Sequence, residues 1–383
     1  MTAEAMTVPS RQDVRSLLGK FAETAAGSRQ LSHPPVIRQF WEDAGAAGLL
    51  APAEAAGPEW RRFSLVVAEE LGRHWLLDLP LWLQSDVLPT VLRLHGTPRQ
   101  QALLPEFARG SAVVSAALSE TANASSLTGL SSTARPVGDG YVINADKRNI
   151  SNAVIADHIA VSAGIGEDGP TTGLFLVPRN TPGIEVTQTS MGLGLELLGT
   201  GTVTFTDVHV PAEALLGGVA DAGGQLQSAM ALEWFFLALM SNAAAWSVVA
   251  ETYTRVNAPR GAGPLLGHSS VRQRVAELVS RLHTVTALMR TLGAGYVETG
   301  TAPADLAAVS KNEAAQVLLA ALDLESGLRG AADLTASPAT SRTDVDGRRR
   351  AAAAQALAGG ATHALHGVTL AGLAARVGQE PII

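Results

Sequence analysis

The chain has 383 residues, 46% of them hydrophobic and 16% charged, so it can bury a large core and is not disordered. Its formal net charge of -7 argues against the basic face that nucleic-acid binding requires, and its lack of cysteine excludes disulfides, thiolate metal sites and a cysteine nucleophile. The apolar runs are shorter than the ~20 residues that span a bilayer, and the first residues lack a signal-peptide layout. We therefore expect a cytoplasmic protein that binds neither nucleic acid nor membrane.

Residues 1–114 carry the apolar period of helices. VIRQFWEDAGAAGLL and FSLVVAEELGRHWLL each repeat it, and Gly72 in the second segment is expected to interrupt or cap the helix. A third segment begins at Pro98, a residue suited to a first helical turn. This part of the chain predicts an antiparallel helical bundle.

Residues 115–217 change to short segments rich in Val, Ile, Thr and Phe. Clusters of Gly, Pro, Asn and Asp separate these segments, and Gly138–Gly140 forms a hairpin-type turn sequence. This pattern is typical of a β-barrel or β-sandwich domain.

Residues 218–383 return to helical periodicity. A long apolar helix beginning near Leu226 is followed by an amphipathic one from Val271, a third from about Ala307, and a fourth that is interrupted near Gly359-Gly360. We therefore expect an α+β protein in which a β-domain lies between two helical domains.

Five segments carry short motifs in a fixed order along the chain. They are EELGR at Glu69–Arg73, HGTPRQQALLPEFARGSA, LSETANASSLTGLSSTARP, DGYVINADKRNISNA and TFTDVHVPAEALLGG. In order and spacing they resemble the motifs of the acyl-CoA dehydrogenase family over nearly the whole chain. The resemblance implies FAD as cofactor, an acyl thioester of coenzyme A or of a carrier protein as substrate, a C-terminal four-helix bundle, and a homodimer or homotetramer.

The resemblance also implies flavin contacts. Ser119 stands where a hydroxyl bonds the flavin ring edge, Ser125 where a serine contacts the pyrophosphate, and Ser151 where a hydroxyl lies near flavin N5. The alternative is a polar loop whose serines bond their own backbone. Asn149 departs from the family pattern, because an aromatic residue that packs on the flavin is usual there.

Two further cofactor positions follow from the family motifs that reach FAD on a neighbouring subunit. The first motif is R-x-x-F-G, whose arginine is matched only by the displaced Arg260. The second is a glycine-rich segment, which keeps one matched glycine, Gly330.

The catalytic base is expected at Glu233. Most family members carry a glutamate in a late helix, where this chain has Ala358 or Gly359. The isovaleryl- and long-chain-type enzymes take the base from an earlier helix instead, and LEWF places Glu233 there. Its apolar neighbours would desolvate the carboxylate and raise its pKa. The alternative is a glutamate near a helix N-terminus, stabilised by the helix dipole.

The remaining histidines give weaker indications of function. His363 and His366 lack further ligands at metal-binding spacing, so no metal is expected, and His283 is expected at a core boundary.

Three functions remain open from the sequence. The first is a flavin-dependent dehydrogenase with Glu233 as base, which the three serines favour. The second is a flavin-free enzyme that catalyses a cyclisation, dehydration or isomerisation of a polyketide-like substrate. The third is a non-catalytic subunit that completes the site of a paralogue in a mixed oligomer. Asn149 and the altered motifs favour the second and third.

Overall fold

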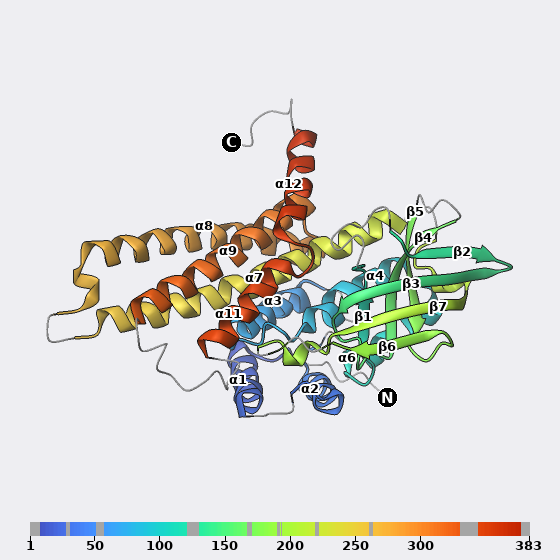
Figure 1. The fold of residues 1–383 in the computed structure, drawn as a ribbon, viewed down its shortest axis with the longest axis horizontal. Coiled ribbons are helices and arrows are strands. Elements are labelled where there is room, and N and C mark those ends of the chain that lie inside the picture. Colours follow the sequence, from blue (N-terminus) through green and yellow to red (C-terminus); the bar gives the residue numbers. More distant parts are fainter. Residues whose placement is uncertain are drawn as a thin grey trace.

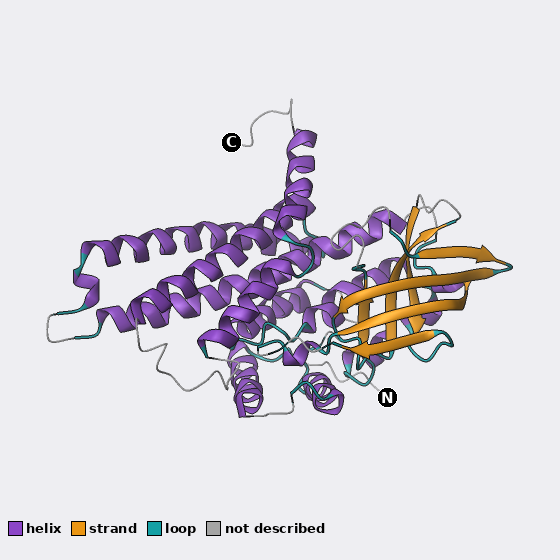
Figure 2. Ribbon diagram, in the orientation of Figure 1, coloured by secondary structure: helices purple, strands orange, loops and turns teal. Residues whose placement is uncertain are grey.

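The structure is a computed structural model. It describes residues 8–27, 31–50, 57–120, 130–166, 171–189, 192, 194–218, 222–259, 263–329 and 344–376. A curled sheet lies at one end of the molecule and long helices extend to the other end, with the N-terminal helices along one side (Figures 1 and 2). This is the α+β fold expected from the sequence.

The N-terminal part is helical. Its elements are α1 (Arg11–Gly27), α2 (Pro34–Ala46), α3 (Pro58–Arg73), the π-helix η1 (Leu83–Val87), α4 (Leu88–His95), α5 (Pro98–Gln101) and α6 (Leu104–Ala108). Pro98 begins α5, and Thr97 caps it by accepting a hydrogen bond from the backbone N–H of Gln100.

Gly72 does not interrupt or cap α3, so that expectation was wrong. The helix continues through it to Arg73. A Cβ at Gly72 would lie 2.2 Å from the carbonyl oxygen of Met240, in the long helix α7 (Ala222–Asn257). The glycine is therefore required by the close approach of α3 to α7.

The central part is one seven-stranded sheet in the order β1-β4-β2-β3-β7-β6, with β5 also paired to β4. The strands are β1 (Val114–Ala117), β2 (Thr133–Val137), β3 (Gly140–Ile150), β4 (His158–Ile165), β5 (Thr171–Pro178), β6 (Ile184–Gln188) and β7 (Gly201–Pro211). β4 pairs in parallel with β1 and β2, and the other pairs are antiparallel. The expected hairpin turn joins β2 to β3 at Gly138, whose φ is +59°.

The C-terminal part is built around α7. It continues with α8 (Ser269–Thr299), α9 (Ala304–Arg329), α11 (Val345–Leu357) and α12 (Thr362–Arg376). Short 3-10 turns lie at Glu196–Leu198, Ala212–Ala214 and Leu265–Gly267. The expected interruption separates α11 from α12 at Gly359 and Gly360, which both have positive φ. α12 projects from the body of the molecule (Figure 1).

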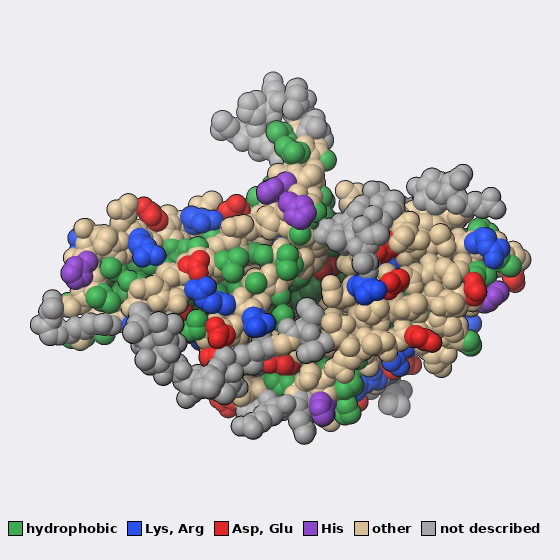
Figure 3. Space-filling model, viewed as in Figure 1, with side chains coloured by type: hydrophobic (Ala, Val, Ile, Leu, Met, Phe, Trp, Pro, Cys, Tyr) green, Lys and Arg blue, Asp and Glu red, His purple; other side chains and the backbone are tan. Residues whose placement is uncertain are grey.

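The core helix α7 is apolar enough, by length and composition alone, to cross a membrane. Within Leu226–Asn257, however, 83% of its most apolar window is buried inside the protein, as in the central helix of a packed bundle. On the face shown in Figure 3, positive and negative side chains are interspersed over the helical part, which is typical of a solvated surface.

Candidate active site

Glu233 lies about three turns into α7, which begins at Ala222. The alternative of a glutamate at a helix N-terminus is therefore wrong, because the stabilising effect of the helix dipole falls off within the first turn. Its neighbours Leu232 and Trp234 are buried, whereas Glu233 itself retains a small exposed surface.

The turn between α11 and α12 packs directly against Glu233. A Cβ at Gly359 would lie 3.2 Å from Glu233 Oε1 and 3.0 Å from Trp234 Cδ1. The indole Nε1 of Trp234 donates a hydrogen bond of 2.6 Å to the carbonyl oxygen of Gly359. The structure thus brings together the two sequence positions considered for the base, with a carboxylate at one and no side chain at the other.

Lys311 of α9 belongs to the same site, although the sequence analysis did not identify it. Its side chain is buried, and Nζ donates hydrogen bonds to the carbonyl oxygens of Ala356, at 2.8 Å, and Gly360, at 2.6 Å. Because the last carbonyls of a helix lack partners within the helix, an ammonium is well suited to bind them. A lysine inside the apolar sequence AAVSKNEAAQVLL was the available signal.

The electrostatics of the site favour a proton acceptor that works near neutral pH. Burial raises the pKa of Glu233 to about 7, and the positive charge of Lys311 partly opposes this rise. Burial lowers the pKa of Lys311 to about 8, and the carboxylate of Glu233 opposes that fall. A carboxyl group in such surroundings exchanges its proton in the range where general acid–base catalysis is most effective.

Ser119 and Ser151 lie on neighbouring segments of the β-domain. Ser119, which follows β1, accepts a backbone hydrogen bond of 2.9 Å from the N–H of Arg148, and the carbonyl of Ser151 accepts one of 2.6 Å from the hydroxyl of Ser115. These bonds fix both backbones. Within the described ranges, neither the Ser119 nor the Ser151 hydroxyl has a protein partner.

Glu120 ties the two ends of the segment that begins after Ser119. Its carboxylate accepts hydrogen bonds from the backbone N–H groups of Ser131, at 2.7 Å, and Ser132, at 3.1 Å, and from both hydroxyls. Lys147 Nζ donates to the same carboxylate at 2.8 Å, and both charged side chains are buried. Burial alone would raise the pKa of Glu120, but the hydrogen bonds from Lys147, Ser132 and Ser131 outweigh it and lower the pKa to about 2.

Asn149 is exposed near the end of β3 and has a φ of +56°. Asparagine tolerates this left-handed conformation better than most residues do. Its small amide offers none of the flat apolar surface on which an aromatic ring would stack. An aromatic stacking contact is therefore missing at this position.

The other predicted positions are not tested by the geometry. Ser125, Arg260 and Gly330 lie outside the described residues. In the part of the chain that is described, no three His, Asp or Glu side chains gather to hold a metal ion. His283 is exposed on α8, where its ring meets Trp246 edge-on at 5.1 Å.

Comparisons with known proteins agree with the three-part architecture. The family profile "Acyl-CoA dehydrogenase, middle domain" matches residues 115–208. Cyclohex-1-ene-1-carbonyl-CoA dehydrogenase of Syntrophus aciditrophicus is 26% identical over 267 residues, which cover 68% of this chain and 64% of that protein. The long-chain specific acyl-CoA dehydrogenase of Sus scrofa is 26% identical over 257 residues, 64% of this chain and 60% of that protein.

A third relative is named as a nitrososynthase and not as a dehydrogenase: the amino sugar nitrososynthase RubN8 of Streptomyces rubradiris. It is 29% identical over 278 residues, which cover 66% of this chain and 64% of that protein. All three matches therefore span less than two thirds of the relative's own length.

The solved structure of an acyl-CoA dehydrogenase from Geobacillus kaustophilus shares the fold, with a TM-score of 0.81 at 22% identity, over 97% of this chain and 100% of that one. The chain therefore has the fold of the acyl-CoA dehydrogenases, and its residues 115–208 match the middle domain of that family.

Proposed function

We propose that this protein is an FAD-dependent dehydrogenase that removes the α-proton of an acyl thioester with Glu233 as the base. The observation that supports this most is the carboxylate of Glu233 on the core helix α7, which has buried neighbours, a pKa near 7 and the backbone of the α11–α12 turn packed against it.

Glu233 has to be ionised to accept the proton, and a pKa near 7 leaves about half of it ionised at neutral pH. Lys311 and Trp234 bind the carbonyls of the α11–α12 turn and so hold Gly359 against the carboxylate. Lys311 is thereby a positioning residue. FAD, when bound, supplies the acceptor for the hydride that leaves Cβ. The hydroxyls of Ser119 and Ser151 would hold the polar edge of its ring.

The named relatives support a thioester substrate. Two of them are named as dehydrogenases of a coenzyme A ester or of acyl-CoA, and a solved structure with the same fold is the prolyl acyl carrier protein oxidase AnaB, at 18% identity. Another structure of this fold, a glutaryl-CoA dehydrogenase from Mycobacterium smegmatis, is described in complex with FADH2. We extend the thioester class, carried by coenzyme A or by a carrier protein, to this chain, together with a cytoplasmic homodimer or homotetramer.

The second candidate function is a non-redox reaction on the same fold, and Asn149 favours it. Without an aromatic side chain at this position, flavin binding loses about 1–2 kcal/mol of stacking and burial. Glu233 alone would then act as acid and base in a cyclisation, dehydration or isomerisation.

The absorption spectrum of the purified protein separates the two functions. Flavin bands near ~450 nm, present on isolation or after addition of FAD, are expected for the dehydrogenase. A colourless protein that takes up no FAD would exclude it. We expect Ser151→Ala to weaken FAD binding about tenfold, the equivalent of one hydrogen bond, whereas Ser280→Ala on α8 serves as the control that leaves it unchanged.

The role of Glu233 is tested separately. If flavin binds, Glu233→Gln should abolish turnover of acyl thioesters while FAD binding persists. Mass measurement of the protein, co-expressed with paralogues, distinguishes a homo-oligomer from the mixed oligomer in which this chain is a non-catalytic subunit.

A further inference from the structure

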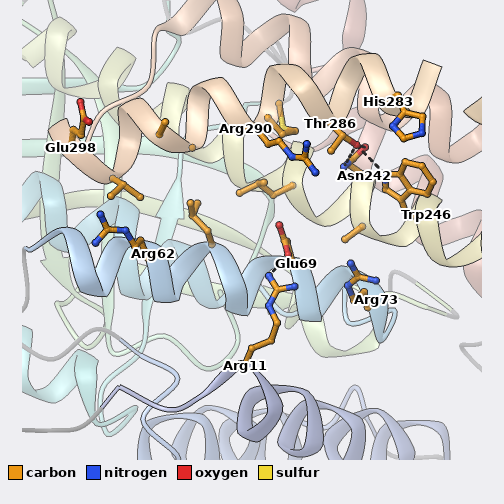
Figure 4. Close-up of a pocket in the computed structure, with 17 residues that line it drawn as sticks. Arg11, Arg62, Glu69, Arg73, Asn242, Trp246, His283, Thr286, Arg290 and Glu298 are labelled. Carbon is orange, nitrogen blue, oxygen red and sulfur yellow. Dashed lines mark hydrogen bonds and ion pairs between the residues drawn. The ribbon is translucent and has the colours of Figure 1, made fainter. Parts of the chain in front are cut away.

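A cavity of about 740 Å3 lies between α3, α7 and α8 (Figure 4). None of the residues that line it belongs to α9 or to the α11–α12 turn, the elements that surround Glu233. Its volume is within the range of about 300–1,000 Å3 that is usual for small-molecule sites. It is therefore separate from the candidate active site.

The floor of this cavity is apolar. Leu65 of α3, Leu239 of α7 and Met289 of α8 contribute to it. Gly293 of α8 leaves it open, because a Cβ there would lie 3.3 Å from Leu65 Cδ1. An aliphatic or aromatic group placed on this floor would remove apolar surface from water, which is favourable by about 25 cal/mol per Å2.

The rim of the cavity is positively charged. Four arginines and two glutamates line it, in a chain whose overall charge is negative. One glutamate, Glu69, is already paired with Arg11. Arg73 and Arg290 stand on opposite walls in Figure 4, and Arg73 has only a loose ion pair with Glu70, at 3.7 Å. Arg290 has no hydrogen bond or ion pair within the described ranges.

The polar side chains at one end of the cavity hydrogen-bond to each other. The hydroxyl of Thr286 accepts hydrogen bonds from Asn242 Nδ2, at 3.1 Å, and from Trp246 Nε1, at 2.9 Å. The cavity thus combines an apolar floor with arginines that lack strong partners, and His283 also lines it. These features are those of a binding site.

We propose that the cavity between α3, α7 and α8 binds an amphipathic organic carboxylate. Its apolar body lies on the floor formed by Leu65, Leu239 and Met289, and its carboxylate is bound by Arg290 and Arg73. The planar guanidinium group forms paired hydrogen bonds with a carboxylate, which an ammonium or a neutral group does not reproduce. This inference is independent of the proposed reaction at Glu233.

Isothermal titration calorimetry of the protein with decanoate tests this proposal, and 1-decanol is the uncharged comparison ligand. We expect decanoate to bind in a salt-sensitive manner and more tightly than 1-decanol. Arg290→Gln should weaken decanoate binding about tenfold, a usual effect for a charge-assisted hydrogen bond. Arg274→Gln, an exposed arginine of α8 that does not line the cavity, is the matched control and should leave binding unchanged.

A blocking variant tests the location. Ala294 is exposed on α8 at the edge of the cavity, so Ala294→Trp should abolish binding, whereas Ala287→Trp on the same helix should not. Glu233→Gln should leave decanoate binding intact. If this variant no longer binds decanoate, the ligand occupies the site at Glu233 and the proposal is overturned.

Two further results would also overturn it. One is equal affinity for decanoate in the wild type, Arg290→Gln and Ala294→Trp. The other is that decanoate does not bind, while Ala294→Trp lowers the mass of the particle in sedimentation, which would identify the cavity as a contact between copies of this chain.

Discussion

Replacement of Glu233 by glutamine removes a titratable group from the site without changing its shape. In the folded protein, burial keeps the pKa of this carboxyl at about 7, compared with 4.5 for the same group in water. The folded state therefore holds the proton more tightly than the unfolded state does. Stability from this effect is fully present below about pH 4.5 and is lost as the pH rises through about 7.

The size of the effect follows from the difference between the two pKa values. Each unit corresponds to about 1.4 kcal/mol, so the wild type loses on the order of 3 kcal/mol of unfolding free energy across this range. Glutamine does not titrate. Relative to the wild type, Glu233→Gln should therefore gain about 2–3 kcal/mol between about pH 5 and about pH 8.

Urea unfolding of both proteins at the two pH values, followed by circular dichroism, measures this change. The control is Glu277→Gln, an exposed glutamate of α8, whose effect should be the same at both pH values. If the difference in unfolding free energy between Glu233→Gln and the wild type is constant with pH, Glu233 is not desolvated, and the argument for its role as a near-neutral base fails.

Three other substitutions test the contact between α3 and α7 and the charged side chains of Glu120 and Lys311. Gly72→Ala should lower the free energy of unfolding by urea by about 2–4 kcal/mol, because the new Cβ meets an α7 carbonyl oxygen at 2.2 Å. The control Gly295→Ala, in open space on α8, should be neutral or stabilising by up to ~1 kcal/mol. Equal effects of the two substitutions would contradict the close approach of α3 to α7. Glu120→Gln should cost about 3–5 kcal/mol at neutral pH because it leaves a buried ammonium without its counter-charge. Since the pKa of Glu120 is held at about 2, the wild-type advantage is present above about pH 4.5 and should shrink as the pH falls towards 2; an advantage independent of pH would refute the pairing. Lys311→Met should raise the pKa of Glu233 further, seen by NMR titration of the carboxyl carbon, and an unchanged pKa would show that the two charges do not interact.

The sequence predicted the elements whose pattern is local. The apolar period of α3 and the alternation of β3 and β7 are visible within each segment, because helix and strand expose different faces at fixed intervals. Gly72 was misinterpreted because its reason lies in Met240, far along the chain. A glycine required by a helix contact looks the same in the sequence as one that ends a helix.

The candidate site was predicted in part. Resemblance to a family singled out Glu233, and its apolar neighbours indicated desolvation. Lys311 and the carbonyls it binds come from α9 and from the turn after α11, so only the folded chain brings them beside Glu233. The charge balance of the site depends on that tertiary contact, which no periodicity encodes.

The carboxylate of Glu120 closes the base of the segment that follows Ser119. It binds the backbone on the far side of that segment through Ser131 and Ser132, and it is itself fixed by Lys147. These contacts hold Glu120, Ser131 and Ser132 together against Lys147 of β3. The chain that leaves β1 and the chain that leads into β2 are thus anchored to the same strand.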